Sequence, residues 1–196
     1  VVKYLPWFKP AAAKASDDAE ITIEELLTHA SGLSREAGTH WSDLAFPDEG
    51  AVKAYVAANP VVYAPEVRWK YSNLAYTIAA LVVEAVSGEK YAEYVRKNVF
   101  APLGMTNSSF DDPVAGLVDG FTRRMPDGTR EKVPFVSAKA MAGATGLTST
   151  LGDMAKFVSL QFANGPRGGR QILSTGALRQ MHRVRMLENN WQRGYA

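Results

Sequence analysis

A single apolar stripe between residues 71 and 86 constrains the fold more than any other feature of this sequence. Its members recur at i, i+4, i+7, i+8 and i+11, the spacing of one face of an α-helix: Leu74, Ile78, Leu81, Val82 and Ala85. The longest apolar run, from Leu74 to Val83 with only Thr77 interrupting it, is about half the ~20 residues that a membrane-spanning helix needs. The pattern therefore predicts a long helix buried in a protein core, and no membrane span.

The composition is that of an ordinary globular chain. Of its 196 residues, 46% are hydrophobic and 21% are charged, which is enough for a sizeable core. The net charge of +2 comes from scattered Lys and Arg residues, so the sequence argues against a nucleic-acid partner. Cysteine is absent, which excludes disulfides, thiolate nucleophiles and Cys-ligated zinc without indicating a compartment. Residues 1–7 show no signal-peptide pattern, and a first residue other than Met suggests processing or truncation.

A capping box marks the start of a first helix. Thr22 is the expected N-cap, and Glu25 lies three residues later, where its side chain can reach back. Ile21 and Leu26 occupy the positions of a hydrophobic staple around it. We expect this helix to stop near Gly32, with the glycine in the left-handed conformation.

The remaining elements are mostly helical as well. We expect a long ordered loop over residues 34–50, helices over 51–58, 71–86 and 91–100, and further helices capped by Ser149 or Thr150 and near Ser174. Pro126-Asp127-Gly128 predicts a hairpin within residues 121–133. The fold class is therefore mainly α with a small β-hairpin.

Metal and phosphate sites are not indicated. The three histidines, His29, His40 and His182, lack the i, i+4 spacing of a zinc helix. His29 lies on the apolar first helix and is interpreted as a structural histidine. The glycine-rich residues 165–169 match no phosphate-binding motif and are interpreted as a turn.

One serine satisfies the nucleophile pattern S-x-x-K, in Ser87-Gly88-Glu89-Lys90. That motif works when the serine and the lysine share one face of a helix. Here Gly88 ends the long helix between them, so the shared face is lost. We interpret this match as accidental.

Tyr71 and Asn73 are the candidate functional residues. They stand where the irregular residues 65–70 turn into the long helix, from which both could project toward a cleft. A nearby cation would favour a tyrosine phenolate, and an asparagine offers both a donor and an acceptor to a substrate amide. A cap or a core contact is the alternative interpretation of both residues.

Short blocks spread along the whole chain follow a known order. Ile21–Leu33 is similar to an I-T-I-x-x-L-L-T-H-x-S-G-L block, and Tyr71-Ser72-Asn73 falls at a Y-x-N motif. The other matches are Tyr4-Leu5-Pro6, Ser87-Gly88, Tyr91, Pro102-Leu103-Gly104-Met105, and Gly143–Thr150 followed by Asp153, Met154 and Phe157. In this order and spacing the chain resembles the serine β-lactamase-like family, which includes class C β-lactamases, DD-peptidases, esterases and D-amino-acid amidases.

The resemblance implies that residues 1–196 are the central, mostly helical part of a β-lactamase-like domain, in which a helical domain packs against an α/β domain. The family's S-x-x-K lies upstream of Tyr-Leu-Pro. Its K-T-G or H-x-G motif follows a G-Y segment, which Gly194-Tyr195 resembles. We therefore expect the nucleophile segment and the final sheet strands to be absent, and the chain alone to be inactive.

The resemblance also assigns roles. In the whole enzyme a serine would form an acyl-enzyme, Tyr71 would exchange protons with that serine and with the leaving group, and Asn73 would orient the substrate amide and the catalytic lysine. A β-lactam, a D-Ala-D-Ala peptide, an ester or a D-amino-acid amide fits equally well as substrate. No cofactor is implied, and the expected partners are a small acyl substrate and the flanking segments of the same domain. The family is compatible with an extracytoplasmic location.

A non-catalytic helical binding module that retains the scaffold is the alternative. The expected absence of a nucleophile favours it. The presence of both Tyr71 and Asn73 weighs against it, because binding alone needs neither.

Overall fold

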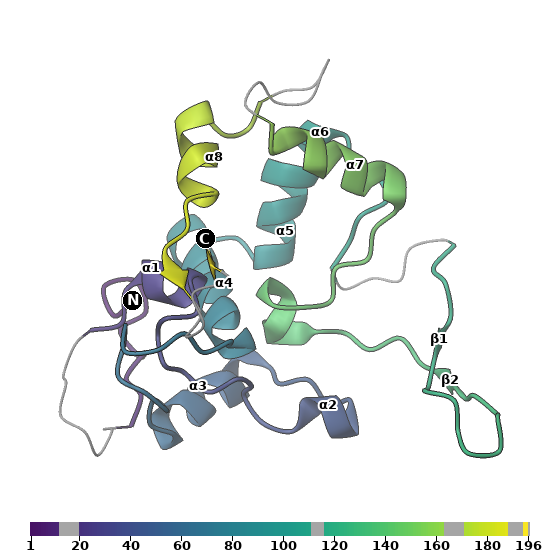
Figure 1. The fold of residues 1–196 in the computed structure, drawn as a ribbon, viewed down its shortest axis with the longest axis horizontal. Coiled ribbons are helices and arrows are strands. Elements are labelled where there is room, and N and C mark those ends of the chain that lie inside the picture. The colour runs from purple at the N-terminus through teal and green to yellow at the C-terminus, as the bar shows by residue number, and fades with distance from the viewer. Residues whose placement is uncertain (12–19, 111–115, 163–170, 188–193, 196) are drawn as a thin grey trace.

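The helix α4 (Asn73–Ser87) is the central element of the structure, a computed structural model that describes residues 1–11, 20–110, 116–162, 171–187 and 194–195 (Figure 1). It packs against α1 (Ile23–Leu27), α5 (Tyr91–Val95) and the 3-10 helix η2 (Lys139–Gly143). The described chain is mostly helical, as the sequence predicts.

The main hydrophobic core gathers on α4. Its buried members also come from the N-terminal segment, α1 and α3 (Glu49–Ala58): Leu5, Phe8, Ile21, Leu26, Leu33, Ala37, Val52, Val56, Leu74, Ala75, Ile78, Leu81 and Val82. Four of the five residues of the predicted stripe lie in this core. Ala85 is exposed instead, because the last turn of α4 runs past the core.

A close approach between η2 and α4 depends on Gly143. A Cβ at this position would lie 2.4 Å from the Ala80 Cβ and 2.7 Å from the Tyr76 carbonyl oxygen. Only glycine lets the two backbones meet at this separation.

A second, smaller core lies at the other end of the molecule. It is formed by Phe100, Leu103, Met105, Leu160 and Leu178. These residues come from the π-helix η1 (Arg96–Phe100), α6 (Ala101–Leu103), α7 (Leu151–Leu160), α8 (Thr175–Met181) and the turn after α6. The predicted helix over residues 91–100 is therefore α5 followed by a π-helical turn.

The predicted starts of α7 and α8 are both confirmed. The Thr150 side chain accepts the backbone N–H of Asp153 at the start of α7, and the Ser174 side chain accepts that of Ala177 at the start of α8. Each cap satisfies one of the N–H groups that an α-helix leaves unpaired at its first turn.

The strands are short. β1 (Gly120–Phe121) pairs antiparallel with β2 (Lys132–Val133), which confirms the predicted hairpin. Gly128 adopts φ 83° in its turn, a left-handed conformation that suits glycine. A second antiparallel pair, β3 (Met186–Leu187) with β4 (Gly194–Tyr195), was not predicted.

The first helix is confirmed at its start and wrong at its end. Thr22 and Glu25 form the capping box, but α1 ends at Leu27 instead of near Gly32. His29 follows the helix with φ 58°, so the prediction that it lies on the helix is wrong. Gly32 does adopt the predicted left-handed conformation, with φ 69°, and a Cβ there would also lie 1.9 Å from the Tyr63 carbonyl oxygen.

Two further boundaries differ from the sequence prediction. The loop expected over residues 34–50 contains a short helix, α2 (His40–Asp43), and the start of α3. The glycine-rich residues 165–169 lie outside the described residues.

None of the helices in the described ranges combines the length and the apolar character that crossing a bilayer requires.

Candidate functional site

The N-terminus of α4 is tied to a distant loop by hydrogen bonds. The Ser72 hydroxyl accepts the N–H of Ala75 at 2.9 Å, as an N-cap does, and donates to the Ser34 carbonyl at 2.7 Å. The N–H groups of Asn73 and Leu74 both donate to the Arg35 carbonyl. Because Ser72 is the cap, α4 begins at Asn73, and Tyr71 precedes the helix rather than opening it.

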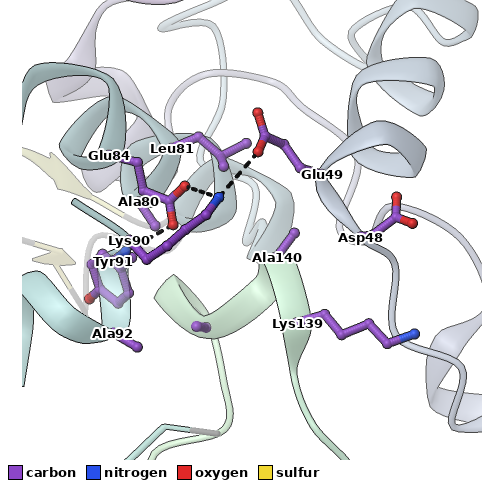
Figure 2. A pocket seen from close by; sticks show the side chains of 11 residues that line it. Asp48, Glu49, Ala80, Leu81, Glu84, Lys90, Tyr91, Ala92, Lys139 and Ala140 are labelled. Atoms are coloured by element: carbon purple, nitrogen blue, oxygen red, sulfur yellow. Dashed lines mark hydrogen bonds and ion pairs between the residues drawn. The ribbon is translucent and has the colours of Figure 1, made fainter. Parts of the chain in front are cut away.

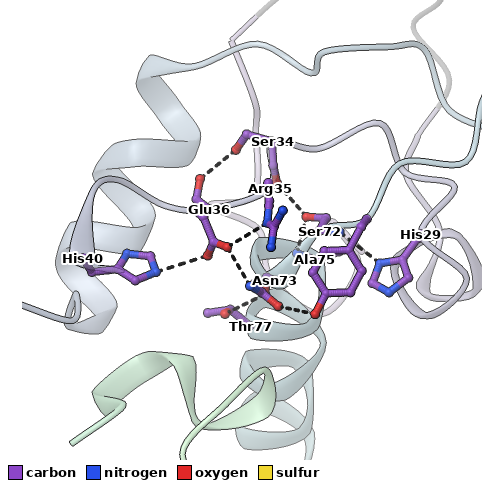
Figure 3. Close-up of polar contacts among 10 residues, drawn as sticks. His29, Ser34, Arg35, Glu36, His40, Ser72, Asn73, Ala75 and Thr77 are labelled. Atoms are coloured by element: carbon purple, nitrogen blue, oxygen red, sulfur yellow. Dashed lines mark hydrogen bonds and ion pairs between the residues drawn. The ribbon is translucent and has the colours of Figure 1, made fainter. Parts of the chain in front are cut away.

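Four side chains form one hydrogen-bonded series at this place, which we call the Asn73 cluster: Tyr71, Asn73, Glu36 and His40. Figure 3 labels the last three of them. The Tyr71 hydroxyl donates to the Asn73 Oδ1 at 2.9 Å, and the Asn73 Nδ2 donates to the Glu36 Oε1 at 2.7 Å. The His40 Nε2 lies 3.1 Å from the Glu36 Oε2. A carboxylate only accepts hydrogen bonds, so this nitrogen carries the proton.

The cluster runs from the interior to the surface. His40 is 2% exposed and its Nδ1 has no partner among the described residues, whereas Asn73 is 7% and Tyr71 41% exposed. The candidate tyrosine therefore presents its ring to solvent, while its hydroxyl is held by a nearly buried amide. This arrangement suits a proton-transferring group that must meet a substrate.

His29 contacts both Ser72 and the Tyr71 ring of the Asn73 cluster. Its Nδ1 accepts the N–H of Ser72 at 3.1 Å, and its ring centroid lies 4.6 Å from that of Tyr71. Burial lowers the pKa of His29 below its usual value. A neutral ring is what the contact requires, because a protonated Nδ1 could not accept from Ser72. The structure thus agrees with a structural role for His29, at a different place from the one predicted.

Tyr76 supports the same ring. Its hydroxyl donates to the Leu27 carbonyl at 2.8 Å, and its ring centroid lies 5.1 Å from that of His29. Burial, and secondarily the neighbouring Tyr71, raises the pKa of Tyr76. Tyr76 therefore serves as a hydrogen-bond donor that joins α4 to the end of α1.

A cation lies beside the candidate tyrosine. The Arg35 guanidinium carbon is 5.4 Å from the centroid of the Tyr71 ring, and its Nε is 3.4 Å from the Glu36 Oε1. Arg35 was missed because it precedes Tyr71 by more than thirty residues and belongs to no sequence motif.

Ser87 is not placed for nucleophilic attack. It is the last residue of α4, its hydroxyl donates to the Val83 carbonyl at 2.7 Å, and Gly88 follows in a left-handed conformation. The Lys90 ammonium turns to Glu84 at 2.9 Å and to Glu49 at 3.5 Å. The hydrogen bond and charge of Glu84, with Glu49 adding to them, raise the pKa of Lys90. The interpretation of Ser87-Gly88-Glu89-Lys90 as an accidental match agrees with this geometry.

The Lys90 ion pairs lie in a pocket of about 270 Å³ away from the Asn73 cluster (Figure 2). Its polar lining is Asp48, Glu49, Glu84, Lys90, Tyr91 and Lys139. The lysine is already engaged by two carboxylates, so its ammonium group is not available as an activating base.

Glu36 and His40 are the site residues that the sequence did not reveal. They lie in the stretch interpreted as a long ordered loop, a location often associated with function. His40 was considered only as a metal ligand, and no group of three His, Asp or Glu side chains that could hold a metal ion occurs within the described ranges. Their link to Asn73 spans 37 residues in sequence and follows from packing alone.

Comparison with known proteins shows the family of the chain. The family model described as Beta-lactamase matches residues 1–196. The chain is 27% identical over 159 residues to the D-alanyl-D-alanine-carboxypeptidase/endopeptidase AmpH of Escherichia coli, covering 80% of this chain and 40% of that protein. It is 32% identical over 145 residues to the esterase EstB of Burkholderia gladioli, covering 68% of this chain and 36% of that protein. The chain thus spans less than half the length of these curated relatives.

The fold is also found among solved structures. A D-stereospecific amidohydrolase from Streptomyces matches 100% of this chain and 60% of its own chain, with a TM-score of 0.79 at 19% identity. A β-lactamase/D-alanine carboxypeptidase from Yersinia pestis matches 93% of this chain and 51% of its own, with a TM-score of 0.66 at 23% identity. At these identities the likeness concerns the fold alone.

Proposed function

The chain belongs to the Beta-lactamase family, and from that premise we propose that it is the central part of a serine hydrolase that works through an acyl-enzyme. The observation that carries the proposal is the hydrogen bond from the Tyr71 hydroxyl to the Asn73 Oδ1 at the solvent-facing end of the Asn73 cluster. It holds a proton-transferring group in a fixed direction while leaving the ring of Tyr71 accessible.

Tyr71 is the proposed proton-transfer residue. Nucleophilic catalysis by a serine needs a group that takes the hydroxyl proton and later returns a proton to the leaving group. Tyr71 would do this as the phenolate, formed when the proton that its hydroxyl donates to Asn73 here has left to solvent, to which the side chain is partly exposed. The phenolate takes the serine proton, and the resulting phenol returns that proton to the leaving group. Arg35, over the ring, is positioned to stabilise negative charge as it develops there.

Asn73 is the proposed orienting residue. Its side chain touches Tyr71 on one side and Glu36 on the other, so it fixes the tyrosine hydroxyl relative to α4. A substrate amide that approaches Tyr71 meets this same polar edge. The names of relatives support a peptide ending in D-alanine, an ester or a β-lactam as the substrate class.

We place the nucleophile outside the residues described. Ser87 and Lys90 have separate partners, so they form no pair of nucleophile and base. In this proposal the 196-residue chain supplies the proton-transfer residue, and the complete reaction needs the full-length gene product.

The test is turnover of a nitrophenyl ester and of a chromogenic cephalosporin by the full-length protein and by residues 1–196 alone. Hydrolysis by the full-length protein, with none by residues 1–196 alone, is expected. Activity of the 196-residue chain that is abolished by Ser87→Ala would contradict the proposal. Binding of these compounds by the full-length protein without turnover would favour the non-catalytic binding module.

A further inference from the structure

We propose that Glu36 is a positioning residue that sets the orientation of the Asn73 amide and, through it, the direction of the Tyr71 hydroxyl proton. This inference rests on the proposed function for its consequence in catalysis, but its geometry stands on the contacts of the Asn73 cluster alone. Glu36 belongs to no block of the family resemblance and lies in a loop far from α4 in sequence.

An asparagine side chain can turn its oxygen and its nitrogen to either side. Both orientations have nearly the same shape, so only the hydrogen-bond partners decide between them. A carboxylate accepts and never donates, so the Glu36 Oε1, at 2.7 Å, selects the Asn73 Nδ2 as its neighbour. The Asn73 Oδ1 is thereby turned to the Tyr71 hydroxyl, 2.9 Å away.

The opposite orientation would change the tyrosine. With its NH2 group toward Tyr71, Asn73 would donate to the phenolic oxygen and occupy one of its lone pairs. The hydroxyl proton would then point to another partner. Because proton transfer depends on that oxygen and that proton, the choice between the two orientations decides which hydrogen bonds Tyr71 makes when it exchanges protons.

Glu36 is itself held in place. The His40 Nε2 lies 3.1 Å from its Oε2, the Arg35 Nε lies 3.4 Å from its Oε1, and the side chain is 16% exposed. The Ser34 hydroxyl donates to the Glu36 carbonyl at 3.0 Å, which fixes the backbone of the loop. With both carboxylate oxygens engaged from the loop side, Glu36 can act as a rigid reference for Asn73 (Figure 3).

The orientation can be read without activity, from the side-chain amide of Asn73 in NMR spectra of the 196-residue chain. In the unaltered chain we expect the Nδ2 protons to exchange slowly with solvent, and the proton that is donated to Glu36 to have a chemical shift displaced from that of a free asparagine amide. Glu36→Leu removes the acceptor and should remove both signatures. Glu36→Gln can present its carbonyl oxygen and should keep them, and Glu49→Gln is the matched control because that carboxylate lies on α3 and outside the cluster. Rapid exchange of the Asn73 amide protons in the unaltered chain would overturn the proposal, and this measurement does not depend on the folding of any variant. Amide signals that stay unchanged in a folded Glu36→Leu protein would overturn it as well.

The catalytic consequence is measured in the full-length protein. Glu36→Leu should lower kcat by up to about 100-fold with KM little changed, since misplacement of a reacting group has effects of this size. Glu36→Gln should recover most of the rate, and Glu49→Gln should leave it unchanged. A Glu36→Leu protein with unaltered kcat would overturn the positioning role. If the unaltered full-length protein hydrolyses nothing, the proposed function fails. The amide signals still test whether Glu36 sets the orientation of the Asn73 amide.

Discussion

Two buried polar clusters in this molecule are built from similar groups and differ in how far they are closed. In the Asp153 cluster, at the start of α7, the carboxylate accepts from the Asn107 N–H at 2.7 Å, the Ser108 hydroxyl at 2.9 Å and the Lys156 ammonium at 2.9 Å. The Asp153 side chain is only 2% exposed. In the Asn73 cluster, by contrast, the series ends at Tyr71, which is 41% exposed.

The difference indicates a division of roles. Burial alone would raise the pKa of Asp153, but the Lys156 ammonium and the Asn107 and Ser108 donors outweigh it and lower that pKa. A carboxylate so fully satisfied stabilises the fold and has nothing left to offer a substrate. The Asn73 cluster keeps one end open and one buried nitrogen of His40 without a partner in the described residues. Changes in the open cluster should therefore affect activity, and changes in the closed one should affect stability.

The largest expected effect is on the rate. Tyr71→Phe removes the proton-transferring oxygen, and kcat of the full-length protein should fall by about 100- to 10,000-fold, the usual contribution of a general acid–base group. Tyr91→Phe is the matched control, since Tyr91 packs against Phe110 outside the cluster. Steady-state kinetics with a nitrophenyl ester give both values. An unchanged kcat in Tyr71→Phe would contradict a role of the Asn73 cluster in activity.

At the closed cluster the expected loss is in stability. Asp153→Ala leaves the donors of Asn107 and Ser108 without their acceptor, so the free energy of unfolding should fall by about 1–3 kcal/mol. Asp127→Ala, at the exposed hairpin turn, should lower it much less, because the solvent can replace the hydrogen bonds that this carboxylate accepts from Thr129. Urea unfolding of the 196-residue chain measures both. Equal effects of the two substitutions would contradict a structural role for the Asp153 cluster.

A smaller loss is expected far from both clusters. Thr22→Ala removes the side-chain acceptor of the capping box, and the free energy of unfolding should fall by about 0.5–2 kcal/mol. Thr22→Ser keeps the hydroxyl and should retain most of the stability. A thermal or urea melt that does not distinguish Thr22→Ala from the unaltered chain would show that the cap contributes nothing.

The most gradual effect should appear with pH. Burial lowers the pKa of His29 from an unfolded value of 6.5, so the unfolded chain binds this proton more readily than the folded one. The contribution of neutral His29 is therefore complete above about pH 6.5 and is lost as the pH falls through the lower, folded pKa. Unfolding free energies measured between about pH 7 and pH 5 should fall in the unaltered chain and fall less in His29→Asn. Identical pH profiles of the two proteins would refute this.

The sequence predicted those parts of the structure that depend on neighbours along the chain. The stripe on α4, the Thr22 capping box, the β1–β2 hairpin and the helix break after Ser87 all follow from periodicity, capping or turn chemistry within a few residues. The prediction of where α1 ends was wrong because two left-handed residues follow the helix, and the glycine at position 32 was taken as the stop instead of the earlier His29.

The candidate site was predicted only in part for the same physical reason. Tyr71 and Asn73 stand two positions apart in a recognisable motif. Glu36, which His40 contacts in turn, reaches Asn73 only because the loop after Leu33 folds back against the start of α4. Contacts of this kind are decided by tertiary packing, and no local pattern encodes the choice of Glu36 as the partner of Asn73.

The central claim, that the open Asn73 cluster serves acyl transfer, is tested most directly by intact-mass spectrometry of the full-length protein mixed rapidly with a nitrophenyl ester. We expect a transient mass increase equal to the acyl group, forming far more slowly in Tyr71→Phe than in Tyr91→Phe, and absent on residues 1–196 alone. An acyl group that forms as fast in Tyr71→Phe as in the unaltered protein, or one found on Ser87, would contradict it.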